Sequence, residues 1–337
     1  MARAAVLGAS GYLGTELVRV LSYHPELELT TAISRSHAGA RLGDVAPQLD
    51  RYADLILAPT ADAVDADVAF VAEPAGAAMD VVPSLLARGI RVVDLGPDYR
   101  LPSAAEYATV YGAPHRDEEH LAEAVYGLPE LFREGIRASR LVANPGCYPT
   151  ATLLALAPLL RHGEVIGPVI VDAKSGTSGS GSTPSPASHH PDAALTVRPY
   201  GQPSHRHAPE MRAALSAAFG DAPPLVFVPH LVPLVRGILC SIYATGRAGA
   251  TADAWSGLLA SAYRDEPFVR VGGVPRLPWA AGTNRCYLSA QAADTVPVVF
   301  SAIDNLGKGG ASQAVQNANV MFGWPETTGL NHPGFGV

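Results

Sequence analysis

This sequence of 337 residues has few cysteines, few charges and no long apolar run. Its three cysteines are an odd number spread widely, which argues against a disulfide framework and against a zinc site. No segment has the roughly 18 uninterrupted apolar residues that a membrane-spanning helix needs. The net charge of −7 shows no basic excess, so nucleic acid is not expected as the main partner.

The N-terminus runs from Met1-Ala2-Arg3 directly into apolar residues and lacks a signal-peptide layout. Together with the sparse cysteines, this predicts a reduced, cytoplasmic, soluble protein. The length exceeds the usual size of one hydrophobic core, and a hydrophobic content of 48% supplies two cores. We therefore expect two domains.

Apolar segments alternate with helical ones in the first part of the chain. Strands are expected over residues 4–7, 27–33, 67–72, 91–95 and 141–143, and helices over 15–21 and 79–87. This βαβ rhythm predicts a Rossmann-like, doubly wound parallel sheet. Later apolar runs predict a second, α+β domain with a mixed sheet, with strands over 169–173, 225–228, 237–243, 285–291 and 296–303.

Three glycines follow the first expected strand: Gly8, Gly11 and Gly14. Their spacing is a variant of the dinucleotide fingerprint, which places a pyrophosphate on a helix N-terminus. The second strand ends at Ser34-Arg35, where an NAD enzyme would place an acid for the ribose hydroxyl. A hydroxyl and a guanidinium favour the 2′-phosphate of NADP; a solvated surface charge is the alternative for Arg35.

The centre of the chain holds Cys147 between a short apolar strand and a long apolar helix. Pro149 fits the first turn of that helix, so Cys147 is expected at the helix N-terminus. Free backbone N–H groups and the helix dipole favour the nucleophilic thiolate there. The alternative is a small buried hydrophobic residue, as for most free cysteines. We interpret Cys240 and Cys286, inside strands, as structural.

A second candidate lies at the start of a later helix. His207 and Glu210 stand three residues apart, so the carboxylate can orient the imidazole of a general base; a structural histidine is the alternative. The preceding loop, from Lys174 to Ser188, is rich in backbone and hydroxyl donors and is expected to be functional. Arg100, after a strand end, fits a phosphate or carboxylate as well as a surface ion pair.

These motifs, taken in order, resemble the N-acetyl-γ-glutamyl-phosphate reductase family (type 1), within the aspartate-semialdehyde dehydrogenase-like superfamily. The resemblance spans the chain and rests on the segments 8–12, 144–150, 174–179, 205–207, 229–237, 302–309 and 314–317. It implies NADPH-dependent reduction of N-acetyl-L-glutamyl 5-phosphate to the 5-semialdehyde, through a cysteine thioester, in arginine biosynthesis. It also implies a homo-oligomer, dimer or tetramer.

The resemblance assigns roles to individual residues. Cys147 is the nucleophile and His207 the acid/base, with Glu210 behind it. The residues expected at the cofactor are Gly8, Ser10, Gly11, Tyr12, Leu13, Ser34, Arg35, Ser175, Gly176 and Asn305. The substrate's phosphate and carboxylate need cationic groups and loop donors, for which we expect, independently of the resemblance, Arg100, Asn144, Lys174, Ser178 and Arg236. The domains expected are 1–146 for NADP, 147–303 for catalysis and dimerisation, and 304–337 as a helix packing back on the first.

Three segments depart from the family pattern. Pro74-Ala75-Gly76 stands for Pro-His-Gly, and Ser182-Thr183 stands where a basic residue is usual. The segment 186–191 is closer to a reductase of lysine biosynthesis, whose α-aminoadipyl phosphate is carried by a small acidic protein. That substrate is the alternative. An oxidative, NAD-dependent dehydrogenase and a regulator with an inert thiol are the rival functions.

Overall fold

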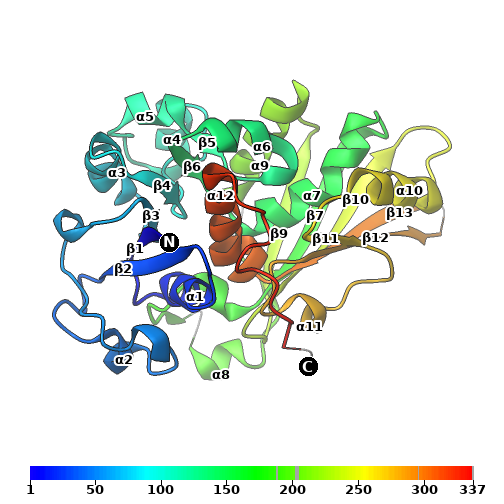
Figure 1. Cartoon of the computed structure of the whole chain (residues 1–337). Helices are drawn as coiled ribbons and strands as arrows, with labels where there is room; N and C mark the ends of the chain where they lie inside the picture. Colours follow the sequence, from blue (N-terminus) through cyan, green and yellow to red (C-terminus); the bar gives the residue numbers. More distant parts are fainter. Residues whose placement is uncertain (187–188, 202–204, 295, 336–337) are drawn as a thin grey trace. The chain divides into compact units, whose positions relative to one another are not determined.

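The computed structural model describes residues 1–186, 189–201, 205–294 and 296–335, which form two compact units (Figure 1). The first unit comprises Met1–Pro145 and Gly310–Asn331. The second comprises Gly146–Gly309 and the described residues from His332 onward. The predicted segment 304–337 is therefore divided: residues 304–309 belong to the second unit, because Asp304 and Asn305 are hydrogen-bonded within it.

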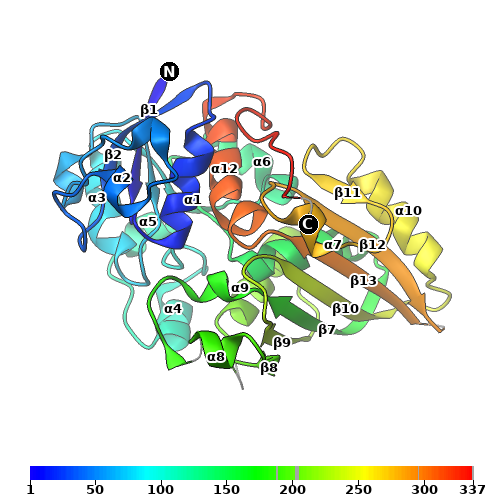
Figure 2. The ribbon, with the colours of Figure 1, turned by 90° about the horizontal axis from the view of Figure 1, so that it is seen from below.

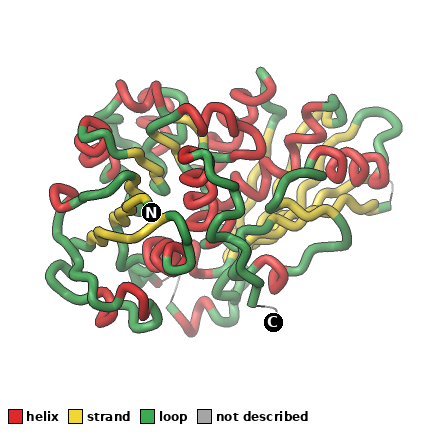
Figure 3. Tube along the Cα trace, in the orientation of Figure 1, coloured by secondary structure: helices red, strands yellow, loops and turns green. Residues whose placement is uncertain are grey.

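The first unit is built on a six-stranded parallel sheet with the order β2-β1-β3-β4-β6-β5. Figure 3 shows strands in yellow and helices in red along the chain. Its strands are β1 (Ala2–Leu7), β2 (Leu27–Ile33), β3 (Val68–Val71), β4 (Arg91–Asp94), β5 (Val125–Tyr126) and β6 (Leu141–Ala143). The chain reverses its direction of travel across the sheet after β2, next to β1. Open α/β sheets bind ligands at the carboxyl ends of such strands.

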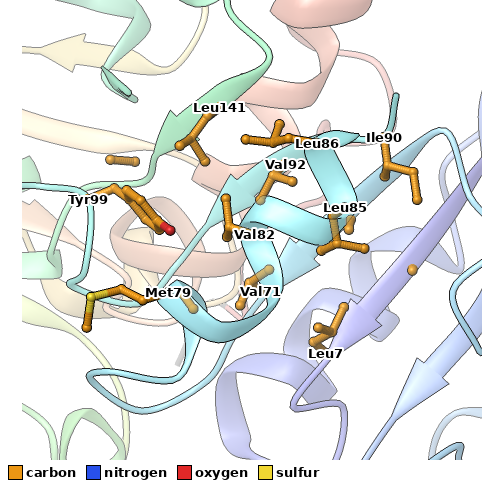
Figure 4. Close-up of a cluster of buried hydrophobic side chains, with 14 of the residues drawn as sticks. Leu7, Val71, Met79, Val82, Leu85, Leu86, Ile90, Val92, Tyr99 and Leu141 are labelled. Atoms are coloured by element: carbon orange, nitrogen blue, oxygen red, sulfur yellow. The ribbon is translucent and has the colours of Figure 1, made fainter. Parts of the chain in front are cut away.

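Helices follow the strands of this sheet. They are α1 (Tyr12–Leu21), α2 (Leu42–Val45), α3 (Ala78–Ala87), α4 (Ala104–Tyr111), α5 (Glu118–Glu123), α6 (Pro129–Ala138) and α12 (Ser312–Phe322). Helix α3 lies over one face, where Val82 and Leu85 pack on Val71 and Val92 of the strands (Figure 4). The apolar strands predicted from the sequence thus bury both faces, as parallel sheets require.

Helix α12, in the last part of the chain, belongs to the first unit, where it packs against α1, α6 and β4. Buried amides hold it there: Asn317 donates to the carbonyl of Gly127 at 2.8 Å and to Oδ1 of Asn144 at 3.0 Å. Oδ1 of Asn319 lies 2.9 Å from Nε2 of His24. Because a buried amide without a partner is costly, these bonds define the position of the helix.

The second unit carries a seven-stranded mixed sheet, with the order β11-β12-β13-β10-β7-β9-β8 (Figure 2). Its strands are β7 (Val165–Ser175), β8 (Arg198–Pro199), β9 (Leu225–Leu231), β10 (Ile238–Gly246), β11 (Val269–Val271), β12 (Cys286–Ala293) and β13 (Val296–Ile303). Strand β7 is antiparallel to β10 and parallel to β9. The predicted strands at 237–243 and 285–291 are each found with small shifts at their ends.

Helices α7 (Cys147–Arg161), α9 (His207–Phe219) and α10 (Ala252–Ala262) pack against this sheet, and α7 packs on α9. Two one-turn helices complete the unit, α8 (His190–Ala193) and α11 (Leu277–Ala280). Helix α7 is buried from Tyr148 to Leu159, in agreement with its almost continuous apolar sequence.

The predicted fold class is therefore confirmed: a Rossmann-like parallel sheet and a second domain with a mixed sheet. The sequence pattern did not indicate α4, α5, α6 or the two-residue strand β5. Helices α4 and α5 carry only a short apolar periodicity, so their pattern is weak. None of the helices in the described part of the chain is both long and apolar enough to cross a membrane.

Candidate active site

Cys147 is the first residue of α7, as the sequence predicted. Gly146 is the N-cap and no side chain caps the helix by a hydrogen bond. The first turn contains no acidic residue, and Pro149 occupies its third position. The thiol therefore stands among backbone N–H groups at the positive end of a 15-residue helix, where an anion is stabilised.

His207 and Glu210 lie against the residue that precedes this cysteine. A Cβ added to Gly146 would stand 2.6 Å from Nε2 of His207 and 3.0 Å from Oε2 of Glu210. The N–H of Gly146 donates to Oε1 of Glu210 at 2.7 Å. Glycine is thus the residue that allows the imidazole to reach this turn, and the buried carboxylate holds the backbone just before Cys147.

His205 has a different task from His207. Its Nδ1 accepts the backbone N–H of His207 at 3.1 Å, which requires that nitrogen to be unprotonated. Burial, with the charge of Arg206 adding to it, lowers the pKa of His205 to about 4. The ring packs edge-on against Tyr148 and Phe227. His205 is therefore neutral at neutral pH and supports the start of α9.

Two tyrosines beside this site were not predicted as site residues from the sequence. The hydroxyl of Tyr200 donates to that of Tyr148 at 3.0 Å, and both rings pack against His205. Burial raises the pKa of Tyr200 to about 12, and raises that of Tyr148 further. Both hydroxyls are therefore neutral donors at neutral pH. Tyr148 follows Cys147 directly, but Tyr200 joins the site only through tertiary packing.

The other two cysteines lie inside strands. Cys240 is fully buried on β10, and burial raises the pKa of its thiol well above the ordinary value. Cys286 is fully buried on β12, with its sulfur 3.5 Å from Oγ of Ser301. Cys147 is partly accessible. Of the three thiols, that of Cys147 is thus the one that a solute can reach.

Asn305 ties two turns of the second unit together. Its amide donates to Oγ of Ser178 at 2.9 Å, and its Oδ1 accepts the N–H of Gly237 at 2.7 Å. Ser175 and Gly176 precede this turn; a Cβ at Gly176 would lie 2.7 Å from the carbonyl of Val235. The backbone of this loop, which the sequence predicted to bind ligands, therefore packs closely against the backbone at Val235.

Arg236 is held by a buried carboxylate. Its Nη2 lies 2.8 Å from Oδ2 of Asp304, and its Nε donates to Oδ1 of Asp304 at 3.2 Å. Asp304 also accepts the N–H groups of Gly282 and Leu306. This bidentate pair gives Arg236 a structural task that the sequence did not indicate.

Lys174 belongs to a charged cluster on neighbouring strands. Its Nζ lies 2.5 Å from Oδ2 of Asp172 on β7, and Nδ1 of His230 on β9 lies 3.2 Å from Oδ1 of Asp172. About 30% of each of Lys174 and Asp172 is exposed. The Lys174 side chain is therefore both paired and partly accessible.

Two predicted substrate residues lie in the first unit. Arg100 donates to the carbonyls of Leu95 and Asn144, at 2.7 and 2.8 Å. The side chain of Asn144 is 1% exposed; it donates to the carbonyl of Gly310 and accepts from Asn317. Arg100 thus joins the carboxyl ends of β4 and β6, and Asn144 joins β6 to the segment that leads into α12.

A buried acid, Asp94, lies at the carboxyl end of β4, near Arg100. Asp94 ends β4, is fully buried and accepts the N–H of Gly96 at 2.9 Å. Burial and the nearby Asp98 raise its pKa to about 7, although Arg100 acts in the opposite sense. The acid is thus partly protonated near neutral pH, a feature that the sequence pattern did not reveal.

The glycine turn of the first unit has the geometry of a phosphate cradle. Gly8 has φ of +81°, and a Cβ there would lie 2.3 Å from the carbonyl oxygen of Ala72. A Cβ at Gly14 would lie 2.1 Å from the carbonyl oxygen of Gly8. At Gly11 the nearest atom would be 3.6 Å away, so that side is open. Gly11 is the N-cap of α1 and no side chain caps this helix.

Polar side chains surround this cradle. The hydroxyls of Ser10 and Ser34 lie 2.7 Å apart, joining the ends of β1 and β2. Tyr12 and Leu13 begin α1, so their N–H groups point out of its N-terminus. Arg35 is 66% exposed, and its Nη2 lies 2.7 Å from Oε2 of Glu73. Among the described residues, no group of three or more His, Cys, Asp or Glu side chains is arranged to hold a metal ion.

Comparisons with known proteins match both parts of the chain. Residues 3–139 match the family model "Semialdehyde dehydrogenase, NAD binding domain", and residues 147–305 match "Semialdehyde dehydrogenase, dimerisation domain". The structure of aspartate semialdehyde dehydrogenase II from Vibrio cholerae superposes with a TM-score of 0.72 at 18% identity, covering 96% of this chain and 98% of that one. The fold is that of a semialdehyde dehydrogenase.

The sequence relatives are more specific. N-acetyl-gamma-glutamyl-phosphate reductase of Moorella thermoacetica is 45% identical over 99% of both chains. The protein of that name from Methanopyrus kandleri is 46% identical over 98% of both. This chain belongs to the N-acetyl-gamma-glutamyl-phosphate reductase family.

Proposed function

We propose that the chain is a cytoplasmic, NADPH-dependent reductase that converts N-acetyl-L-glutamyl 5-phosphate to N-acetyl-L-glutamate 5-semialdehyde and phosphate in arginine biosynthesis. One observation carries the proposal: Cys147 begins a long helix, and His207 and Glu210 pack on the residue before it. The names and the identity of the curated relatives support the substrate.

The first half-reaction uses residues of the second unit. The thiolate of Cys147 attacks the acyl carbon, the bond to the phosphate oxygen breaks, and a thioester forms. His207 takes the thiol proton and supplies a proton to the departing phosphate. The N-terminus of α7 stabilises negative charge on sulfur. Glu210, through Gly146, keeps the cysteine at this position.

The second half-reaction needs a reductant; NADPH, when bound, would supply the hydride that reduces the thioester carbonyl. His207 then stabilises the oxygen of the tetrahedral adduct. The carbon–sulfur bond breaks and the aldehyde leaves, which restores the Cys147 thiolate. The neutral hydroxyls of Tyr148 and Tyr200 offer further donors within the same group of side chains.

The first unit fits the cofactor that this chemistry needs. The close contacts at Gly8 and Gly14, with the open position at Gly11, form a cradle for the pyrophosphate. We assign the pyrophosphate to the N–H groups from Ser10 to Leu13, and the 2′-phosphate to Ser34 and Arg35. We propose that the nicotinamide end of the cofactor is bound by Ser175, Gly176 and Asn305.

The predicted substrate residues divide into two groups. Lys174 and Ser178 are proposed to contact the acyl phosphate, since both are polar residues of the β7 end and the loop that follows. Arg100, Asn144 and Arg236 are proposed to act indirectly, through the turns that their hydrogen bonds hold. The segment 186–191 includes residues 187 and 188, which lie outside the described part of the chain.

The test is the reverse reaction. Purified protein with inorganic phosphate and NADP⁺ should reduce NADP⁺ when N-acetyl-L-glutamate 5-semialdehyde is added. The matched α-aminoadipate semialdehyde, free or attached to an acidic carrier protein, should react at least about 100-fold less efficiently, a difference of about 2.7 kcal/mol. A preference for the aminoadipyl compound would replace the proposed substrate, and no reaction with either would reject the function.

The open face of the second sheet supports a homo-oligomer. Helices α7, α9 and α10 contact the sheet, yet Ile170, Val226 and Tyr243 are 45%, 51% and 40% exposed on its strands. A hollow of about 440 Å³ lies beside Ile170 and Tyr243. We propose that a second copy covers this face, as exposed apolar patches of this kind mark interfaces. Sedimentation of a Tyr243→Glu variant tests it.

A further inference from the structure

The ion pair between Arg35 and Glu73 lies where the adenosine end of a dinucleotide is expected. Strand β1 stands between β2 and β3, so Arg35 beyond β2 and Glu73 beyond β3 meet across the carboxyl end of β1. The glycine turn is adjacent, because Gly8 packs on the carbonyl of Ala72, the residue before Glu73.

The two partners differ in how well they are held. Glu73 is 13% exposed, whereas Arg35 is 66% exposed. The carboxylate is therefore the fixed member of the pair, and the long arginine side chain has room to turn away from it. Nη2 of Arg35 lies 2.7 Å from Oε2 of Glu73, the distance of a charge-assisted hydrogen bond.

The pair affects the two forms of the cofactor in opposite ways. A 2′-phosphate recruits the guanidinium, so it competes with Glu73 for Arg35 and is repelled by the carboxylate. An unphosphorylated ribose carries a hydroxyl at that position, which can donate to a carboxylate, the interaction that NAD-binding sites use.

We propose that Glu73 sets the cofactor preference of this chain: by holding Arg35, it weakens the binding of NADPH relative to that of NADH. The inference rests on the proposed function, in which Arg35 reads the 2′-phosphate. Glu73 is a specificity residue that acts through Arg35. The chain therefore discriminates between the two cofactors less strongly than Arg35 alone would allow.

Binding measurements on the full chain test the proposal without turnover. Glu73→Gln keeps the shape and removes the charge, and the dissociation constants of NADPH and NADH follow from calorimetry. The ratio of the NADH constant to the NADPH constant should rise by about fivefold, mainly through tighter NADPH. The control is Asp80→Asn, which removes one negative charge from the Arg116 ion pair in the same unit and should leave the ratio unchanged.

The double variant Arg35→Ala/Glu73→Gln separates the explanations. With Arg35 removed, Glu73→Gln should change the ratio less than about twofold. An unchanged ratio in Glu73→Gln alone, or a fivefold effect that persists without Arg35, would overturn the inference. If Arg35→Ala itself leaves the ratio untouched, the fault lies in the assignment of Arg35 to the 2′-phosphate, which is a failure of the proposed function.

Discussion

Two helices of the molecule begin in the same way, α1 after Gly11 and α7 after Gly146, but the surroundings of the two helix N-termini differ. Each glycine is the N-cap of a helix with no side-chain cap and no acid in its first turn. At Gly11 an added Cβ would meet its nearest atom at 3.6 Å, so the position stands open. At Gly146 it would meet His207 at 2.6 Å, so the position is packed by side chains.

The difference shows how one physical device supports two tasks. An uncapped helix N-terminus attracts negative charge in both places. In the first unit the space over α1 is left for a ligand to supply that charge. In the second unit α7 begins with a thiol, and the buried Glu210 and His207 surround the turn. The first turn is built to bind and the second to react.

The largest expected effect on activity follows from replacing Cys147, whose thiolate the N-terminus of α7 stabilises. Cys147→Ser should fold and bind NADPH, but should lose more than about 10⁴-fold of kcat, because a hydroxyl is far less acidic than a thiol and His207 cannot ionise it to the same extent. Mass spectrometry of a reaction quenched without NADPH should find the acyl group on the Cys147 peptide of the wild-type protein.

Cys240→Ser and Cys286→Ser are the matched controls. Both thiols are fully buried inside strands, so their loss should change stability and leave kcat within about twofold. Alkylation should modify Cys147 before either of them, since Cys147 is the accessible thiol. An acyl group found on Cys240 or Cys286 would overturn the mechanism.

The next largest effect on activity concerns the histidines that pack near the Gly146 turn. His207→Ala should slow phosphate release in a single turnover without NADPH by about 10²–10⁴-fold, the usual share of a positioned acid/base, with NADPH affinity unchanged. His205→Asn should cost less than about tenfold, because His205 acts as a neutral acceptor for the α9 backbone. If His205→Asn is the more damaging of the two, the roles are reversed.

A smaller effect tests the openness of the first turn. Gly11→Ala should cost at most about 1 kcal/mol of stability, as a poorer N-cap, and should weaken NADPH binding by about tenfold, because the methyl group occupies the approach to the pyrophosphate. Gly14→Ala should instead cost at least about 2 kcal/mol of stability, since its Cβ would lie 2.1 Å from the carbonyl oxygen of Gly8. Urea titration and calorimetry measure the two quantities.

A further prediction separates the two units by the pH dependence of their stability. Asp94, in the first unit, has its pKa raised to about 7, so the folded chain binds more protons and its stability falls as pH rises from about 4 to 7. His205, in the second unit, has its pKa lowered to about 4, so stability is lost as pH falls from about 6.5 to 4.

Each variant should remove one of these opposed slopes. Relative to wild type, Asp94→Asn should gain stability with rising pH, and His205→Asn should lose it, each by about 1 kcal/mol per pH unit in the window. Urea unfolding at half-unit pH steps measures both differences. Slopes of the same sign in both variants would contradict the assigned protonation states.

Much of the fold was readable because it depends on neighbours in sequence. The strands predicted at residues 27–33 and 141–143 are β2 and β6, with the bounds that the structure has. The strand, glycine turn and Pro149 placed Cys147 at a helix start for local reasons of backbone geometry. Helices α4 and α5 were missed because their apolar periodicity is short.

The sequence by itself determined the two sheets, the glycine turn, the cysteine at the helix start and the His207–Glu210 spacing, since each follows from residues a few positions apart. Only the tertiary structure decided which distant side chains contact one another. It placed Tyr200 on Tyr148, Arg236 on Asp304 and Arg35 on Glu73. Residues 38 to 68 positions apart meet in the last two pairs only after the strands have paired, and strand order is set by the packing of the whole sheet.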